Sequence, residues 1–272
     1  GADRRRQPVA VGRPGIQAAR SRRQDHGCDT RGARRRRMTA EQLMDSLHTA
    51  TGKPMRGEVQ SFSQDGAQGP STFFEMGRPS RAWQLVCTSN ERDRNSLRIP
   101  EVDMLNELMQ AFGWRPQRQD PQDRHDVPPT PLRPLLLANG SAASRLLDAT
   151  ADAWLTQAAK KAESPEDFVH LLMLATLSRR ASTEEVHRLV PHIEEGFASR
   201  LTGQQDHMQP VYRRRVSWRN HFDPLADKLV LERIDVLREG DPPTRSLTTD
   251  WRERAEDIQW SLVNSPEFTW VP

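Results

Sequence analysis

Six consecutive polar residues form the first candidate binding site in this sequence: Ser89, Asn90, Glu91, Arg92, Asp93 and Arg94. They follow the apolar run Ala82–Cys87, whose composition favours a short β-strand. A polar loop that follows a rigid element is a frequent position for binding residues. A carboxylate of Glu91 or Asp93 with a shifted pKa in a cleft would indicate an enzyme. The alternative is a solvated turn whose two acidic and two basic side chains neutralise each other.

The second candidate is the basic patch Arg213, Arg214 and Arg215, which lies between Tyr212 and Trp218. Guanidinium groups beside aromatic rings can bind single-stranded nucleic acid through charge and stacking. A short basic run is also an ordinary surface feature of an otherwise acidic protein. We favour the surface interpretation, so nucleic acid is not expected to be a partner of this patch.

Side chains that could ligate a metal occur without the spacing of a known site. The segment Asp120–Asp126 contains three aspartates and a histidine, but it lacks the glycine and the terminal glutamate of a calcium loop. His187 and His192 are five residues apart, whereas two ligands on one helix face are four apart. The sequence also lacks Cys-x-x-Cys-His, a phosphate loop, a dinucleotide fingerprint and a Gly-x-Ser-x-Gly elbow. No metal site and no cofactor are predicted.

Positive charge is concentrated at the beginning of the chain. Residues 1–37 contain twelve arginines against three aspartates, and no Leu, Met, Phe, Trp or Tyr. A segment of this composition cannot bury enough apolar surface to offset the entropy of ordering it, so we expect a disordered Arg-rich extension. It could be a basic arm for nucleic acid or another anionic polymer. The favoured alternative is an extension without a role of its own, from a misplaced start or a shifted reading frame.

Residues 38–272 are expected to fold as a single helical domain. Thr39–Ala50 begins with Thr39 and Gln42 at the spacing of a capping box, which predicts a helix start. The other helices are predicted from apolar spacing. They are expected at Pro100–Phe112, Leu132–Asp148 with a break at Asn139-Gly140, Ala151–Ala162 and Pro224–Arg238.

An α-hairpin is predicted in the second half of the chain. Ser164–Ser178 has a serine cap, proline at the first helical position and acidic residues in the first turn. Ser182 and Glu185 then have capping-box spacing for the next helix.

The closing segment has the most regular apolar pattern. Four apolar residues share one helix face: Trp251, Ala255, Ile258 and Leu262. Asp250 is the expected cap, with Glu253 as its partner three residues later. Pro266 should end the helix, and Phe268 and Trp270 are expected to fold back as anchors.

Residues 55–99 have the weakest helical pattern of the predicted domain, because glycine and proline interrupt them repeatedly. Ser71–Phe74 and Ala82–Cys87 are candidates for two short strands. The expected fold is therefore mainly α, an irregular multi-helix bundle with a small β or irregular insertion near residues 55–99.

Cysteine use and hydropathy limit the class of protein. A disulfide between Cys28 and Cys87 is not expected, because it would join a predicted coil to a predicted core. No apolar run approaches eighteen residues, so no membrane span is predicted. The first residues lack the apolar region of a signal peptide.

Three stretches resemble the planctomycete-type domain-of-unknown-function family 1553. The first is the helix start Arg36–Leu43, which is similar to the family's RRMTAEQL, and the second is Ser89–Arg94. The third is the family's closing pattern, matched by Asp257, Trp260, Leu262, Asn264, Ser265, Glu267 and Phe268. The resemblance covers about residues 34–272.

The resemblance implies an exported or periplasmic protein, although no signal peptide is visible here. Family members are usually longer, with an uncharacterised domain and often a c-type cytochrome module upstream, and the family name implies no reaction. The leading hypothesis is a non-catalytic helical module that packs against such an upstream region or another protein partner. One alternative is an enzyme half-site that includes Asn90–Asp93, and another is a nucleic-acid binder that uses the Arg-rich extension.

Overall fold

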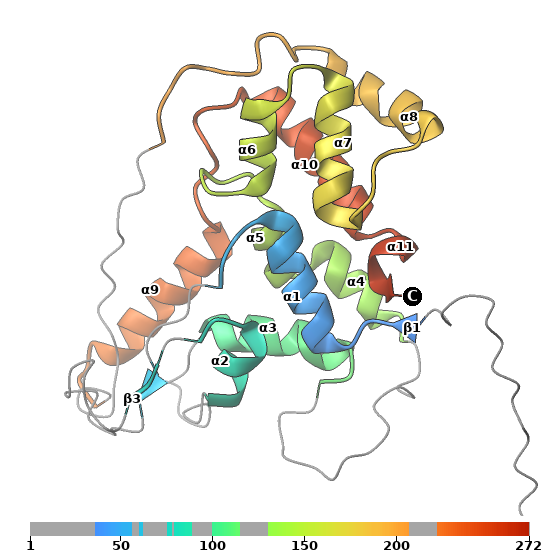
Figure 1. Ribbon diagram of the computed structural model, residues 1–272. Coiled ribbons are helices and arrows are strands. Elements are labelled where there is room, and N and C mark those ends of the chain that lie inside the picture. The colour runs from blue at the N-terminus through green and yellow to red at the C-terminus, as the bar shows by residue number, and fades with distance from the viewer. Residues whose placement is uncertain are drawn as a thin grey trace, which may run out of the picture. The chain divides into compact units, whose positions relative to one another are not determined.

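The computed structural model describes residues 36–55, 60–61, 75–77, 79–88, 100–114, 130–206 and 222–271 (Figure 1). All of them belong to one unit, Arg35–Pro272. Within these ranges the chain forms eleven helices and two short antiparallel strand pairs. The fold is therefore mainly α, as the sequence predicts.

The first core cluster is built mainly by five helices between residues 40 and 147. They are α1 (Ala40–Thr51), α2 (Ala82–Thr88), α3 (Pro100–Ala111), α4 (Leu132–Asn139) and α5 (Ser141–Leu147). The capping box predicted for α1 is confirmed. Gln42 N donates to Thr39 Oγ1 at 3.3 Å, and Thr39 N donates to Gln42 Oε1 at 3.1 Å. Leu43 and Leu47 are fully buried on the inner face of α1.

The second core cluster is formed by α6 (Trp154–Lys161), α7 (Pro165–Leu177), α8 (Thr183–Glu194) and α10 (Thr249–Val263). The predicted caps of the α7–α8 hairpin are both present, at Ser164 and at the Ser182–Glu185 capping box. Phe168 of α7 meets Trp251 of α10 edge to face, with ring centroids 5.1 Å apart. Such ring pairs add to the free energy gained from apolar burial.

Helix α10 packs into both clusters. Its predicted stripe is confirmed, because Trp251, Ala255, Ile258 and Leu262 are all buried in the second cluster. Val263, on another side of the helix, is buried in the first. The indole Nε1 of Trp251 donates to Ile193 O at 2.9 Å. The predicted cap is wrong: the N-cap is Thr248, so Asp250 lies inside the first turn, where its negative charge still favours the helix dipole.

The two ends of the described unit meet in a strand pair. β1 (Arg36–Arg37) is antiparallel to β4 (Trp270–Val271), which follows the short helix α11 (Pro266–Thr269). Arg36 and Arg37 are thus two residues of the predicted extension that have regular structure. Phe268 is buried as predicted, whereas Trp270 is 39% exposed and only half fulfils the predicted anchoring. The guanidinium of Arg37 lies 5.1 Å from the Trp270 ring centre.

The insertion contains one strand pair, β2 (Gln60–Ser61) with β3 (Glu75–Gly77). The strand predicted at Ala82–Cys87 is wrong, because these residues form helix α2. Ala82, Leu85 and Val86 have helical spacing and are all buried, and the Gln84 side chain accepts from Ser80 N at 2.9 Å at the helix start. The other predicted strand, Ser71–Phe74, lies outside the described residues.

Two predicted helix starts come too early. α6 begins at Trp154 rather than Ala151, because Thr150 and Asp152 form a side-chain hydrogen bond in the preceding turn. α9 (Ala226–Glu239) begins two residues after Pro224. The break predicted at Asn139-Gly140 is confirmed between α4 and α5.

Candidate functional site

The sites predicted from the sequence lie outside the described residues. This applies to the loop Ser89–Arg94 and to the patch Arg213–Arg215, and the whole segment Asp120–Asp126, for which no metal site was predicted, lies outside them as well. Among the residues that are described, no group of three or more His, Cys, Asp or Glu side chains could hold a metal ion. None of the described helices is long and apolar enough to cross a membrane.

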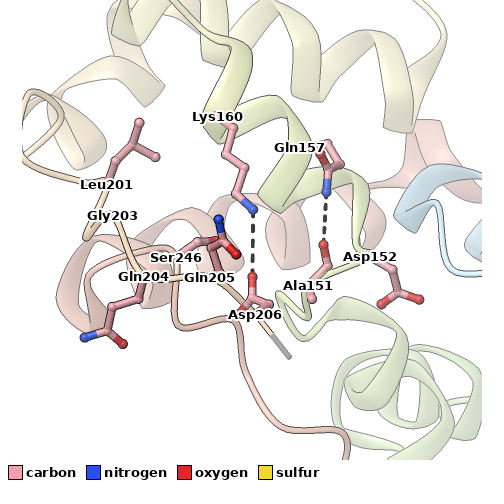
Figure 2. A pocket seen from close by; sticks show the side chains of 10 residues that line it. All are labelled: Ala151, Asp152, Gln157, Lys160, Leu201, Gly203, Gln204, Gln205, Asp206 and Ser246. Atoms are coloured by element: carbon pink, nitrogen blue, oxygen red, sulfur yellow. Dashed lines mark hydrogen bonds and ion pairs between the residues drawn. The ribbon is translucent and has the colours of Figure 1, made fainter. Parts of the chain in front are cut away.

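The described unit contains a pocket of about 690 Å³ whose walls carry both polar groups and apolar surface (Figure 2). It is open to solvent and is formed by the α5–α6 loop, helix α6, the segment that follows α8 and the turn before α10. Its lining residues are Ala151, Asp152, Gln157, Lys160, Leu201, Gly203, Gln204, Gln205, Asp206 and Ser246.

The segment on one side of the pocket is fixed by backbone contacts and by a buried arginine. Leu201 forms a bridge with Leu247, and Thr202 N donates to Ser246 O at 3.1 Å. The guanidinium of Arg200 donates to the carbonyls of Ala159, Phe197 and Ala162, each at 2.7 Å. Burial lowers the pKa of Arg200. The bonds to Ala159 and Ala162 hold the segment against the end of α6, and the bond to Phe197 fixes the preceding turn.

Asp206 is the most constrained carboxylate of the pocket. It accepts from Thr244 Oγ1 and from Arg245 N, both at 2.7 Å. Burial opposes ionisation, but the hydrogen bonds outweigh it and hold the pKa of Asp206 below its ordinary value. Lys160 Nζ lies 3.8 Å from Asp206 Oδ2, which is an ion-pair distance and too long for a direct hydrogen bond.

A second charged group, the Lys53 cluster, lies where the end of α1 approaches the α5–α6 loop and the α9–α10 turn. We define it as Lys53, Arg145, Asp148, Asp241 and Glu256. Lys53 is only 7% exposed, and its Nζ donates to Arg145 O at 2.6 Å. Burial lowers the pKa of Lys53 and raises the pKa values of Asp148 and Glu256.

The members of the Lys53 cluster act mainly on the backbone. Glu256 accepts from Ala149 N at 2.7 Å, which fixes the start of the α5–α6 loop. Arg145 reaches Asp241 at 3.2 Å. Among the described residues, Lys53 and Asp148 do not form a direct ion pair, and none of the cluster's members lines the pocket of Figure 2. Burial is the largest cause of these pKa shifts, and the bonds to backbone atoms give the cluster a structural role.

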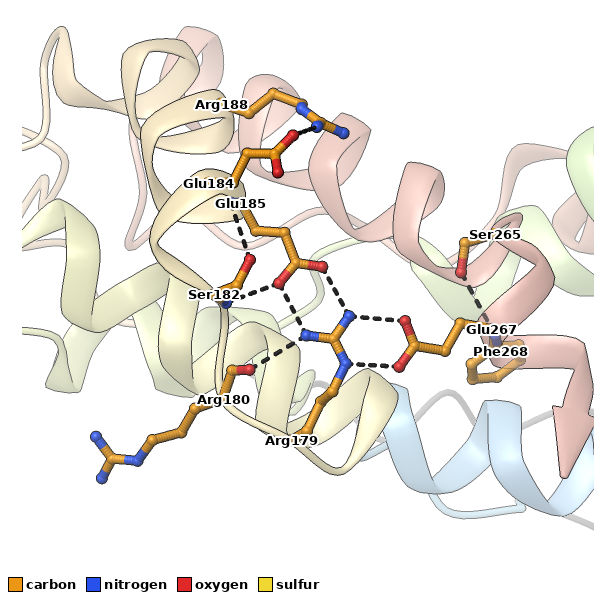
Figure 3. Close-up of polar contacts among 9 residues, drawn as sticks. All are labelled: Arg179, Arg180, Ser182, Glu184, Glu185, Arg188, Ser265, Glu267 and Phe268. Carbon is orange, nitrogen blue, oxygen red and sulfur yellow. Dashed lines mark hydrogen bonds and ion pairs between the residues drawn. The ribbon is translucent and has the colours of Figure 1, made fainter. Parts of the chain in front are cut away.

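A third charged group, the Arg179 network, joins α7, α8 and α11 (Figure 3). The guanidinium of Arg179 donates to Glu185 at 2.8 and 2.7 Å and to Glu267 at 2.5 and 2.7 Å. The hydrogen bonds from Arg179 are the largest cause that lowers the pKa of Glu185 to about 2. Planar two-pronged pairs of this kind are the strongest ion pairs of proteins.

The closing sequence pattern has a structural explanation in this region. Asn264 Nδ2 donates to Trp260 O at 2.9 Å, at the end of α10. Ser265 caps α11, Glu267 pairs with Arg179, and Phe268 is buried in the first cluster. The pattern therefore fixes the C-terminal turn onto the α7–α8 hairpin, and no member of it lines the pocket.

The pocket was missed in the sequence because its residues come from three separate stretches. Gln, Asp, Lys and Ser are ordinary surface residues, and their spacing shows no motif. The one sequence signal that could have pointed to it is Thr244–Ser246, a short polar stretch before the closing helix.

The protein family described as PSD1, protein of unknown function (DUF1553), matches residues 19–193. This range is more than half of the chain, begins within the Arg-rich extension and ends in α8, before the closing pattern. No curated protein and no solved structure matches the chain.

Proposed function

Because the chain belongs to the PSD1 family of proteins of unknown function (DUF1553), we propose a function from its surface: it is a helical interaction module that packs against another region of a longer family protein. The observation that carries this proposal is an exposed apolar surface on α4 and α10. We call it the α4–α10 surface and define it as Leu132, Leu135 and Trp260.

The α4–α10 surface combines large apolar side chains that are close to each other. Leu132 and Leu135 lie one helical turn apart and are 48% and 56% exposed. Trp260 is 42% exposed, and its indole Nε1 donates to Ala138 O at 2.8 Å, so the ring lies against α4. Tryptophan is enriched among the residues that contribute most to protein binding. An exposed ring held in place by a hydrogen bond loses little conformational freedom on binding.

Positive charge beside this surface indicates that the partner carries negatively charged groups. Burial and, secondarily, the positive charge of Arg37 lower the pKa of Arg133 in α4, so the basic strand β1 lies near this helix. Arg36 and Arg37 are both exposed. A partner with apolar residues flanked by carboxylates fits this combination, because opposite charges at the rim orient the two surfaces.

Calorimetric titration tests the proposal. The probe is the separately produced upstream region of a longer family protein, and it is added to the purified chain. Leu135→Asp should weaken binding at least about tenfold, or about 1.4 kcal/mol, because it places a charge in the apolar contact. The matched control is Leu231→Asp on α9, where the leucine is 60% exposed, and it should leave the affinity within about twofold.

Both variants should keep the melting temperature of the unsubstituted chain, because neither leucine is in the core. Failure of the unsubstituted chain to bind the probe would refute the proposed partner. An equal loss of binding affinity in Leu135→Asp and Leu231→Asp would show that the α4–α10 surface is not the interface.

A further inference from the structure

The pocket offers hydrogen-bond donors and acceptors beside apolar surface, in a space that suits a small molecule. Its volume of about 690 Å³ is within the usual range for ligand pockets. Asp152 and Asp206 provide carboxylates, Lys160 provides an ammonium group, and Gln204 and Gln205 provide amides. We propose that this pocket binds a neutral polyhydroxylated ligand with the size of one or two sugar rings. This inference does not depend on the α4–α10 surface.

The gap between Lys160 and Asp206 favours a hydroxyl group over a charged one. The two side chains are 3.8 Å apart, so neither satisfies the other by a direct hydrogen bond. A hydroxyl group can accept from the ammonium and donate to the carboxylate at the same time. An anionic ligand group only accepts, and Asp152 and Asp206 would repel it. A cationic group only donates, and Lys160 would repel it.

The acceptor side of the pocket is already in place before a ligand arrives. Thr244 and Arg245 hold both oxygens of Asp206, and the carboxylate stays ionised because its pKa is held below the ordinary value. Gln157 Nε2 donates to Ala151 O at 3.0 Å, which orients its amide (Figure 2). Groups that are fixed in advance lower the entropic cost of binding.

The remaining lining suits the apolar face of a sugar ring. Leu201 is 47% exposed at one edge of the pocket. Nothing lies within 4 Å of the position that a Cβ atom would take at Gly203, so a flat ring can approach the backbone there. A ligand with hydroxyl groups on its edge and C–H groups on its face would contact both kinds of surface.

An NMR titration of the full chain tests this proposal, with the neutral disaccharides maltose, cellobiose and lactose as probes. At least one should shift the Gly203 backbone signal and the side-chain amides of Gln157 and Gln205, with a dissociation constant of about 1 mM or below. Lys160→Met should weaken binding about tenfold, because it removes a charged donor to the ligand. Lys161→Met is the matched control, and it should change the affinity by less than about twofold, because Lys161 is exposed and does not line the pocket.

Gln205→Ala provides a second variant that should leave the fold intact, because Gln205 is exposed. It should weaken binding as well. The proposal is overturned if none of the three disaccharides shifts these signals. It is also overturned if inorganic phosphate shifts the same signals more strongly than the sugars do, since the pocket would then be an anion site.

Discussion

Helices α9 and α10 follow each other in the chain and have similar lengths, but they contribute differently to the fold. α10 buries six residues, including Trp251, Ile258 and Leu262, and it contacts α5, α6, α7, α8 and α11. α9 buries Ala226, Val230 and Leu237 and packs mainly on α3, so several of its apolar side chains remain exposed. Apolar spacing alone therefore predicts a helix, whereas the depth of its burial depends on how many other elements surround it.

The difference predicts where the fold is most sensitive. A helix that packs into both core clusters cannot detach without opening both, so its residues should report on global unfolding. A helix with one main contact can open locally at a smaller free-energy cost.

The largest effect is expected for Ile258→Asp in α10. Ile258 is 4% exposed. Loss of its burial costs about 2 kcal/mol, and a buried carboxylate adds at least as much in desolvation. We expect a loss of about 4 kcal/mol or more, which is most of the stability of an ordinary domain. Urea denaturation of purified protein measures it. The neighbouring variant Asp257→Ala is the control, and its stability should lie within about 0.5 kcal/mol of that of the unsubstituted chain, since Asp257 is exposed. An unchanged denaturation curve for Ile258→Asp would contradict the central role of α10.

A smaller loss of stability is expected for Arg179→Met, which removes the ion pairs that join α11 and α8 through Arg179. Charge-assisted hydrogen bonds to two carboxylates are removed, and we expect a cost of about 2 kcal/mol because all three side chains are partly exposed. The matched control is Arg188→Met, whose pair with Glu184 is much more exposed and should matter by less than about 0.5 kcal/mol.

The stability lost in Arg179→Met should depend on pH in a defined way. The pKa of Glu185 is about 2 in the fold and 4.5 as an ordinary carboxyl. A lowered carboxyl pKa stabilises the fold above the ordinary value, and that stability is lost as the pH falls through the lower one. The stability difference between the unsubstituted chain and Arg179→Met should therefore shrink between pH 4.5 and about 2. A constant difference across that range would show that Arg179 does not act through Glu185.

A gain in stability is expected for Lys53→Met in the Lys53 cluster, which lies beside the turn between α9 and α10. The lowered pKa of Lys53 means that burial costs its charged form more than Asp148 and Asp241 return. Removal of the charge with a side chain of similar volume should stabilise the fold by about 1 kcal/mol at neutral pH. The gain should shrink as the pH rises through the lowered pKa of Lys53 in the fold and disappear above 10.5, where the lysine is neutral in both states. A destabilised Lys53→Met would show that the carboxylates need this ammonium.

The smallest effect is expected for Leu231→Asp on the outer side of α9. Leu231 is 60% exposed, so its replacement should change the stability by less than about 0.5 kcal/mol. A loss comparable with that of Ile258→Asp would mean that α9 is covered in solution, and sedimentation analysis would then test for a second copy on this face.

Local signals in the sequence predicted the parts of the fold that depend on neighbouring residues. The caps at Thr39, Ser164 and Ser182 need only a side chain and the next turn of backbone, and all three were predicted correctly. Ala82–Cys87 was predicted as a strand because short apolar runs fit either structure. Its helix forms where buried neighbours accept the 3.6-residue spacing, and the sequence does not show those neighbours.

The pocket and the buried charges depend on contacts over long distances in the chain. Arg200 and Lys53 have no local feature that separates them from exposed basic residues, and their burial results from the packing of α6 and α5. The binding loop at Ser89–Arg94 and the patch at Arg213–Arg215 remain predictions.

The strand pair between β1 and β4 has a mechanical consequence. Arg36 is paired with Val271 and Arg37 with Trp270, so the chain enters and leaves this antiparallel pair at the same end. Tension that pulls residues 36 and 271 apart would load the pair in an unzipping geometry, one hydrogen-bonded rung after another. The next contact to take the load is the bond from Met38 N to Thr269 O. Under stretching, this end should open at low force while α10 is still seated between its two clusters.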